Sequence, residues 1–278
     1  MNKKDLIEGY KKEEQMLISK MLDKVEETKQ KNKITNTDFL DEYQMKICHD
    51  VLNKIKYENY IPFGGYEGAE RKILIFYPEK LKFIVNNCVD DNHILIKNDK
   101  TFLDKLCAIR IRVPNELHGK YVHKNYLGMV MKLGVVREKV GDILVQDIGA
   151  DIIILPEIAK YLINSLGQLT RLKKADIKEI EINQVEKVES KTKEYQIVVA
   201  ALRLDNVIAE LARTSRVQAK EIILQERVFI NFKNETKLIK QINEKDIITI
   251  RGRGRFRILE IIGNTQKGRY IIKVEKYV

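Results

Sequence analysis

Near the start of the chain, apolar residues recur every three or four positions among Lys and Glu. This spacing predicts one amphipathic helix over residues 3–31 and a second helix with an apolar stripe over 39–55. Thr35 or Thr37 is expected to cap the second helix. We expect the two helices to form a hairpin that makes an N-terminal region of residues 1–62.

After a turn signal at Gly64-Gly65, the pattern changes to short apolar runs of strand length. Strands are predicted at residues 72–77, 93–97, 108–113, 142–146, 151–155, 179–188 and 195–202. Helices are predicted at 124–133, closed by Gly134, and at 157–166, stopped by Gly167. Strands interleaved with two helices indicate an α+β sandwich, which we assign to a central domain of residues 63–190.

The last part of the chain combines two short helical segments, 204–212 and 216–225, with further strand patterns. Strands are predicted near 228–231, 246–251, 255–262 and 269–275. Gly263-Asn264 is expected to turn the last hairpin. This pattern predicts a third domain over residues 191–278, so that the fold class of the whole chain is α+β.

Charge changes this picture because it is unevenly distributed. The chain has a formal net charge of +11 and a pI near 9.3, with 44% hydrophobic and 33% charged residues, as in globular domains. Residues 203–278 hold 17 Lys and Arg against 9 Asp and Glu, whereas residues 1–202 hold 34 against 31. A basic C-terminal part favours an anionic partner such as nucleic acid.

Several other kinds of function are disfavoured by what the sequence lacks. Apolar runs fall short of a membrane span and the N-terminus has no apolar signal-peptide core. The chain has three scattered cysteines, Cys48, Cys88 and Cys107. Their odd number fits a reducing compartment, so we expect a cytoplasmic protein. The histidines lack metal-ligand spacing, and no Gly-rich phosphate loop or nucleophile elbow is present. We therefore expect no metal, no cofactor and no catalytic residue.

The start of the second C-terminal helix is the first candidate site. Ser215 is placed to cap this helix and Gln218 to reach back in a capping box. Arg213, Arg216 and Lys220 put cations near the helix N-terminus, where the helix dipole disfavours each by about 0.3–1 kcal/mol. A bound phosphate would reverse this sign, because amides and cations would share one anion. The alternative is that these side chains only point into water.

An arginine ladder follows. Its members are Arg251, Arg253, Arg255 and Arg257. In a regular strand these side chains would share one face, and Gly252, Gly254 and Phe256 would lie on the other. Four arginines without an intervening acid favour a stripe that contacts phosphates. The alternative is an edge strand that charge protects from aggregation.

Two segments of the central region are weaker candidates. Tyr66 and Arg71 follow the Gly64-Gly65 pair and could stack on or pair with RNA, although a domain-entry loop with Tyr66 buried explains the same residues. Lys124 lies among aromatics at residues 121–126, and packing at the start of a helix explains that segment equally well.

Arg203-Leu204-Asp205 raises an enzymatic alternative, since pseudouridine synthases carry a catalytic Asp in a similar context. Here the tripeptide opens a helix, so Asp205 is more simply a first-turn residue favoured by the dipole.

Residues 202–250 resemble the S-four RNA-binding domain, also called the alpha-L motif. The matching positions are Arg203-Leu204-Asp205, Ser215-Arg216, Ala219, Val228, Ile230-Asn231, Asp246 and Ile248. The chain departs from the general pattern at Glu226 and Phe232, where glycine is common, and at Lys245 before Asp246.

Further motifs resemble the YlmH family of bacterial S-four proteins. They are Phe63-Gly64-Gly65-Tyr66, Ala69-Glu70-Arg71-Lys72, Asn125-Tyr126-Leu127-Gly128, Leu133-Gly134, Arg137-Glu138-Lys139, Gly141-Asp142-Ile143 and Arg251-Gly252 with Gly254-Arg255-Phe256. The resemblance implies an RRM-like central domain, a C-terminal S-four domain and no catalytic centre. It also implies binding to ribosomal RNA of the large subunit beside peptidyl-tRNA, in rescue or quality control of stalled translation, with an older link to cell-division gene clusters.

Together these patterns predict a monomeric RNA-binding protein. The expected RNA contacts are Arg203, Arg213, Thr214, Ser215, Arg216, Lys220, Asn231, Lys233, Arg251, Arg253 and Arg255. Candidate contacts to tRNA or ribosomal RNA are Tyr66, Arg71 and Lys124. Because residues 72–77 lack the aromatic consensus for base stacking, we do not expect the central sheet to bind single-stranded RNA in the usual way. The alternatives are an RNA-modifying enzyme and a division or membrane-associated adaptor.

Overall fold

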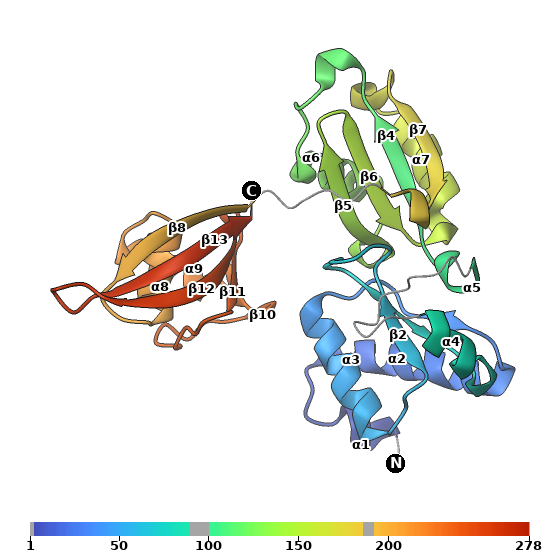
Figure 1. Cartoon of the computed structure of the whole chain (residues 1–278), viewed down its shortest axis with the longest axis horizontal. Helices are drawn as coiled ribbons and strands as arrows, with labels where there is room; N and C mark the ends of the chain where they lie inside the picture. Colours follow the sequence, from blue (N-terminus) through green and yellow to red (C-terminus); the bar gives the residue numbers. More distant parts are fainter. Residues whose placement is uncertain (1–2, 89–99, 186–191, 278) are drawn as a thin grey trace. The chain divides into compact units, whose positions relative to one another are not determined.

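The computed structural model describes residues 3–88, 100–185 and 192–277. The chain divides into two compact units, Met1–Val188 and Glu189–Val278, and each is described by itself. Figure 1 follows the chain through both units from blue to red. Each unit contains helices packed on antiparallel sheet, so the predicted mixture of α and β structure is confirmed.

The first unit begins with helices that pack on a small sheet. These are α1 (Lys3–Ile7), α2 (Lys12–Lys31) and α3 (Glu42–Lys54), and the sheet has the order β1-β3-β2 with β1 (Thr35–Asn36), β2 (Tyr60–Phe63) and β3 (Ile73–Phe76). The prediction of one helix over residues 3–31 is wrong, because Gly9 takes a left-handed φ of 86° between α1 and α2.

The cap of α3 also differs from the prediction. The carboxylate of Asp41 accepts the amide of Gln44 at 2.8 Å, and the side chain of Gln44 accepts the amide of Asp41 at 3.0 Å. A carboxylate suits the positive end of a helix. Thr35 and Thr37 do not cap α3, because Thr35 lies in β1 and the hydroxyl of Thr37 accepts the amide of Leu74 at 2.9 Å.

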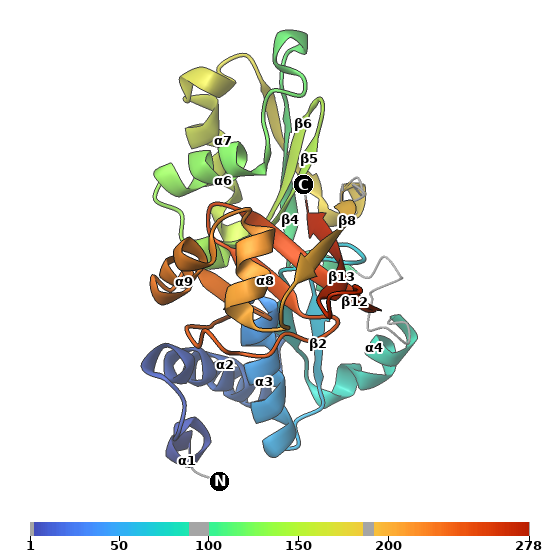
Figure 2. The ribbon, with the colours of Figure 1, turned by 90° about the vertical axis from the view of Figure 1, so that its left-hand side faces the viewer.

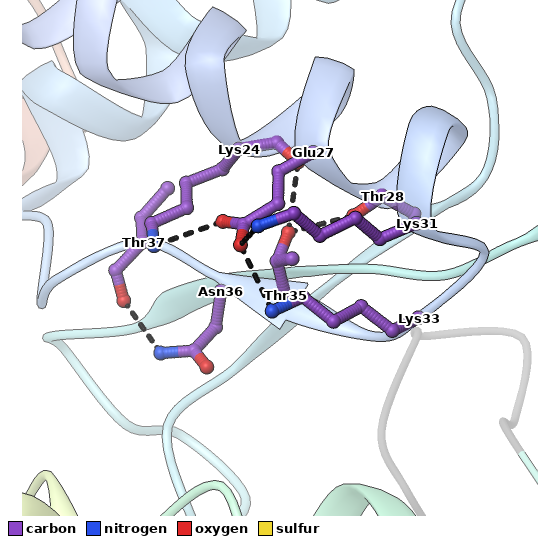
Figure 3. A network of polar contacts seen from close by, with 8 residues as sticks. All are labelled: Lys24, Glu27, Thr28, Lys31, Lys33, Thr35, Asn36 and Thr37. Atoms are coloured by element: carbon purple, nitrogen blue, oxygen red, sulfur yellow. Dashed lines mark hydrogen bonds and ion pairs between the residues drawn. The ribbon is translucent and has the colours of Figure 1, made fainter.

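Side chains fasten the end of α2 to β1 (Figure 3). The buried hydroxyl of Thr35 donates to the carbonyl of Lys24 at 2.9 Å, so it accepts from the hydroxyl of Thr28 at 2.6 Å. Beside them, hydrogen bonds from Lys33 and Lys31 lower the pKa of Glu27 to about 2. This network fixes the connection between α2 and the small sheet.

A four-stranded sheet forms the rest of the first unit. Its order is β5-β6-β4-β7, with β4 (Cys107–Arg112), β5 (Val140–Gln146), β6 (Gly149–Ile154) and β7 (Asp176–Glu181). Helices α6 (His123–Lys132) and α7 (Ala159–Gly167) cover one face through a shared apolar core. The chain order β-α-β-β-α-β is that of a split βαβ motif.

The opposite face of this sheet joins the small sheet. Leu144 and Ile153 from the four-stranded sheet share a buried cluster with Ile73 and Ile75 of β3. Helices α4 (Lys82–Cys88) and α5 (Lys100–Leu103) lie between β3 and β4 in the chain. Short 3-10 helices lie at Glu79–Leu81, Asn115–Leu117, Arg137–Lys139, Pro156–Ile158, Thr170–Leu172 and Ile182–Gln184. The predicted strand 93–97 and residues 186–188 lie outside the described residues.

The second unit is a six-stranded antiparallel sheet, and two helices pack on it through a shared apolar core. Figures 1 and 2 show this unit in orange and red. The helices are α8 (Leu204–Leu211) and α9 (Arg216–Leu224). The sheet has the order β10-β9-β11-β12-β13-β8, with β8 (Thr192–Val199), β9 (Val228–Ile230), β10 (Lys233–Asn234), β11 (Ile247–Ile250), β12 (Gly254–Asn264) and β13 (Tyr270–Tyr277).

The hairpin between β12 and β13 turns later than predicted. Gly263 and Asn264 belong to β12 and pair with Ile271 and Tyr270. The turn is made by residues 265–268, where the amide of Gly268 donates to the carbonyl of Thr265 at 2.8 Å. Gly268 supplies the left-handed φ of 69° that this turn uses.

Candidate nucleic-acid interface

A buried carboxylate organises the ends of α8 and α9. Asp205, in the first turn of α8, is fully buried, and its Oδ2 atom accepts hydrogen bonds from Arg203 at 3.1 Å and from Arg216 at 2.8 and 2.9 Å. The side chains of Arg203 and Arg216 are 38% and 51% exposed, so part of each side chain lies at the surface. Asp205 therefore holds two arginines in fixed positions at the surface.

This pairing explains why a cation is tolerated in the first turn of α9. Burial raises the pKa of Asp205. The hydrogen bonds and charges of Arg216 and Arg203 together lower it by more, so that the pKa lies below its ordinary value. Neither alternative considered from the sequence had included this carboxylate. Arg216 is neither free in water nor dependent on a phosphate, because Asp205 already supplies the anion that offsets the helix dipole.

Ser215 caps α9 as predicted, since its hydroxyl accepts the amide of Gln218 at 3.2 Å. The expected capping box is wrong, however. The side chain of Gln218 accepts the hydroxyl of Thr214 and does not bond to the backbone of Ser215. Thr214 and Ser215 are thus both used by the α8–α9 turn.

Arg213 lies in that turn in a strained backbone conformation. Its φ is 51°, and the amides of Arg213 and Thr214 donate to the carbonyls of Glu210 and Ala209 at 3.1 and 2.9 Å. These bonds make a Schellman motif, whose left-handed position is usually glycine. An arginine there costs about 1–2 kcal/mol of backbone strain. The side chain of Arg213 is exposed, so burial of that side chain does not offset the strain.

The cations of the α8–α9 corner come from the start of α8, the α8–α9 turn, the first half of α9 and the turn 251–253. Arg253 donates to the carbonyl of Ala212, the residue before Arg213, at 3.3 Å. Lys220 is exposed one turn after Arg216. The Nε atom of Arg203 is buried without a hydrogen-bond partner within the described residues. We name this group the corner cations: Arg203, Arg213, Arg216, Lys220 and Arg253.

The arginine ladder is divided between a turn and a strand. Arg251 and Arg253 lie in the turn 251–253, and Arg255 and Arg257 lie in β12. Gly252 and Gly254 take φ values of 81° and 122°, so the alternation of glycine and arginine bends the chain here. The four side chains would share one face only in a regular strand, and that condition is not met at residues 251–253.

Of the other predicted contacts in the second unit, Asn231 is exposed but hydrogen-bonded to other groups of the protein. Its side-chain amide donates to Asp246 at 2.8 Å and its carbonyl oxygen accepts the amide of Ile247 at 2.9 Å. Lys233, in β10, is exposed at the edge of the sheet.

In the first unit, Tyr66 and Arg71 bond to the protein interior. The hydroxyl of Tyr66 donates to Asp142 at 2.9 Å, and Arg71 donates to the carbonyls of Val140 and Phe39 at 3.1 and 3.0 Å. Burial raises the pKa of Tyr66 and of Asp142. These contacts support the entry-loop interpretation over RNA stacking. Lys124 is exposed in the first turn of α6.

The sequence had not singled out Arg110 and Arg112, which lie on the sheet face opposite α6 and α7. Both bond to the buried Asp151, Arg110 through two nitrogens at 2.9 and 2.7 Å and Arg112 at 3.2 Å. Two arginines on one carboxylate repeat the arrangement around Asp205. The alternation in Ala108, Arg110 and Arg112 was the signal that could have identified them.

No group of three His, Cys, Asp or Glu side chains suited to a metal ion occurs within residues 3–88, 100–185 and 192–277. Among the described helices, none combines the length and apolar character that a bilayer crossing requires. Asp205, the candidate catalytic residue of the enzymatic alternative, is occupied by its arginine partners.

Comparison with known proteins gives three similarities. Residues 104–187 match the family model described as "Putative RNA-binding domain in YlmH". The chain is 26% identical over 277 residues to the "Ribosome-associated protein quality control protein P2" of Bacillus subtilis (strain 168), with 98% of each chain covered. The structure of cell division protein ylmH from Streptococcus pneumoniae aligns with 64% of this chain and 96% of that chain, at 15% identity and a TM-score of 0.45. The predicted resemblance to the YlmH family is confirmed by the first two.

Proposed function

For this YlmH-like chain, we propose a non-enzymatic, cytoplasmic and monomeric RNA-binding protein that associates with the large ribosomal subunit. It binds ribosomal RNA, beside peptidyl-tRNA, and acts in ribosome-associated quality control. The name of the Bacillus subtilis relative supports both the association with the ribosome and the role in quality control.

One observation carries the RNA-binding part of this proposal. Arg213 occupies the left-handed position of a Schellman motif, where glycine would avoid the strain, and its side chain is exposed among the corner cations. Arg216 and Arg203 lie beside it, oriented by Asp205. Cations held at a helix N-terminus suit the phosphates of a folded RNA.

The corner cations would hold the RNA backbone without reading its sequence. Arg213, Arg216 and Lys220 are the main phosphate contacts, with Arg253 beside them. Thr214 and Ser215 serve by shaping the turn, and Asn231 by holding Asp246. Lys233, Arg251 and Arg255 extend the basic surface along the sheet.

The first unit would add a second contact. The family model that describes an RNA-binding domain covers the four-stranded sheet, which carries Arg110 and Arg112. Arg110 and Arg112 give this part of the sheet two cations around the one buried carboxylate that both contact. Lys124, on the helix side, is the remaining candidate for a tRNA contact.

The decisive experiment compares two glycine substitutions in the full chain. Glu226 takes the same left-handed position at the end of α9 as Arg213 does at the end of α8, with amides of Glu226 and Arg227 bonded to Ile223 and Ile222. Arg213→Gly and Glu226→Gly therefore relieve the same backbone strain, but only the first removes a corner cation.

Binding to purified large ribosomal subunits would be measured by cosedimentation across a series of KCl concentrations. The wild type should bind with a steep salt dependence. Arg213→Gly should bind several-fold more weakly, with a slope lower by about one, while Glu226→Gly should not bind more weakly than the wild type. Salt-independent association, or equal binding by wild type and Arg213→Gly, would contradict the proposal.

A further inference from the structure

A row of side chains crosses four neighbouring strands of the six-stranded sheet on the face turned away from α8 and α9. Thr249 of β11 is paired with Phe229 of β9 and with Arg255 of β12. Tyr277 of β13 continues the row, with its ring centre 5.9 Å from the guanidinium carbon of Arg255. Residues on either side of this row along the strands are buried in the core: Val228, Ile230, Ile248, Ile250 and Phe256. The row therefore faces outward.

Guanidinium groups stack on the rings of this face. The guanidinium carbon of Arg251 lies 4.7 Å from the ring centre of Phe229, and that of Arg255 lies 5.2 Å from Phe232. Arg257 approaches the ring of Tyr277 at 6.0 Å. We name these six residues the arginine–aromatic platform. Its three rings lie outside the core cluster and are only partly buried.

The backbone of Phe232 adds a second, independent observation. Phe232 has a φ of 67° in the turn between β9 and β10, a conformation that glycine adopts without strain. A large aromatic residue there is costly for the fold and brings a ring beside Arg255. Backbone strain at a partly buried position is typical of a functional site.

We propose that the arginine–aromatic platform binds the unpaired bases of a single-stranded RNA segment. This inference rests on the proposed RNA-binding function and gives it a second, chemically different site. A base offers a flat π face to the rings or the guanidinium planes, and the arginines that it displaces can turn to the adjoining phosphates.

Charge and shape favour this occupant over paired RNA. The platform has three arginines, which favour an anionic ligand such as RNA. One acid, Glu275, is paired with Arg257 across the strands and offsets part of this charge. Stacking requires bases that are splayed out, and a duplex keeps its bases inside the helix. The row spans three strand spacings, on the order of 14 Å, which is long enough to engage more than one base.

The test uses the full chain and two labelled RNAs, a single-stranded oligo(A) and a blunt RNA duplex, measured by fluorescence anisotropy. Phe229→Leu combined with Tyr277→Leu removes two rings and retains apolar side chains. It should weaken oligo(A) binding by about tenfold or more and leave duplex binding within about twofold. Arg255→Ala should also weaken oligo(A) binding, more than Arg269→Ala, which removes an exposed cation just after the hairpin turn.

A second variant gives a direct readout of stacking. The chain contains no tryptophan, so Tyr277→Trp introduces a single reporter on the platform. Its fluorescence should be quenched by oligo(A) and not by the duplex. This measurement also covers the case in which the double leucine variant does not fold.

The outcomes separate the two proposals. Binding to ribosomal subunits and duplex, with oligo(A) binding unchanged by the leucine substitutions or with no quenching of Tyr277→Trp, overturns the platform alone. Platform rings that matter for binding an acidic peptide and not for oligo(A) overturn it as well. Absence of binding to every RNA would remove the proposed function together with this inference.

Discussion

Arg216 reaches back to Asp205, eleven residues earlier in the chain, and places Nε and Nη2 at 2.9 and 2.8 Å from the same carboxylate oxygen. The contact joins the first turns of α8 and α9. Asp205 is fully buried, whereas half of the Arg216 side chain is exposed. A single carboxylate thus fixes the packing of two helices and orients a cation toward the surface.

Replacing Asp205 with Asn should destabilise the second unit. Asparagine keeps one accepting oxygen but lacks the negative charge that offsets the two arginines, and breaking a buried pair costs about 3–5 kcal/mol. Because Arg203 and Arg216 are partly exposed, we expect a smaller loss of about 1–3 kcal/mol in the free energy of unfolding. Urea denaturation would measure it. The exposed Glu221→Gln is the control, and equal stability of the two variants would contradict the role of the pair.

The same pair predicts a dependence on pH. Since the pKa of Asp205 in the folded protein lies below its ordinary value of 3.8, its contribution to stability is present above that value and lost as the pH falls through the folded pKa. The difference in unfolding free energy between wild type and Asp205→Asn should be constant from neutral pH to about pH 5 and shrink in more acidic solution. Denaturation at each pH tests this; a difference that grew on acidification would exclude it.

Local patterns in the sequence were enough for the parts of this site that depend on neighbouring residues. The two helices of the corner and the Ser215 cap follow from short-range spacing, and the motifs carried the family resemblance. The partner of Arg216 could not be predicted in this way. Asp205 lies on another helix, and only the packing of α8 on α9 brings the two side chains together.

The geometry of the arginine ladder could not be predicted for a different reason. Alternating residues predict a strand only where the backbone is extended, and the left-handed φ values of Gly252 and Gly254 turn it instead. Tyr66 presents the same limit. Its partner Asp142 follows 76 residues later, so the sequence alone could not separate an internal hydrogen bond from an exposed aromatic.

The two Schellman motifs predict a gain in stability. Arg213 and Glu226 have φ values of 51° and 57°, and glycine adopts such values without a clash of its side chain. Arg213→Gly and Glu226→Gly should each raise the free energy of unfolding by about 0.5–1 kcal/mol. Urea denaturation of both variants measures the change. Loss of stability in Arg213→Gly alone would show that its side chain supports the fold and would remove the reason for treating it as an RNA contact.

Tyr66→Phe should weaken the fold and leave RNA binding intact. The carboxylate of Asp142 accepts the hydroxyl of Tyr66 at 2.9 Å and the amides of Glu70 and Arg71 at 2.7 and 3.2 Å, so it fixes the entry loop on β5. Removing one of these bonds should cost about 1 kcal/mol in the unfolding of the first unit. Tyr161, which is half-exposed, donates its hydroxyl to the carbonyl of Leu133, so Tyr161→Phe is the matched control and should cost less. If Tyr66→Phe instead lost affinity for large ribosomal subunits at unchanged stability, Tyr66 would be an RNA contact and its bond to Asp142 would be incidental.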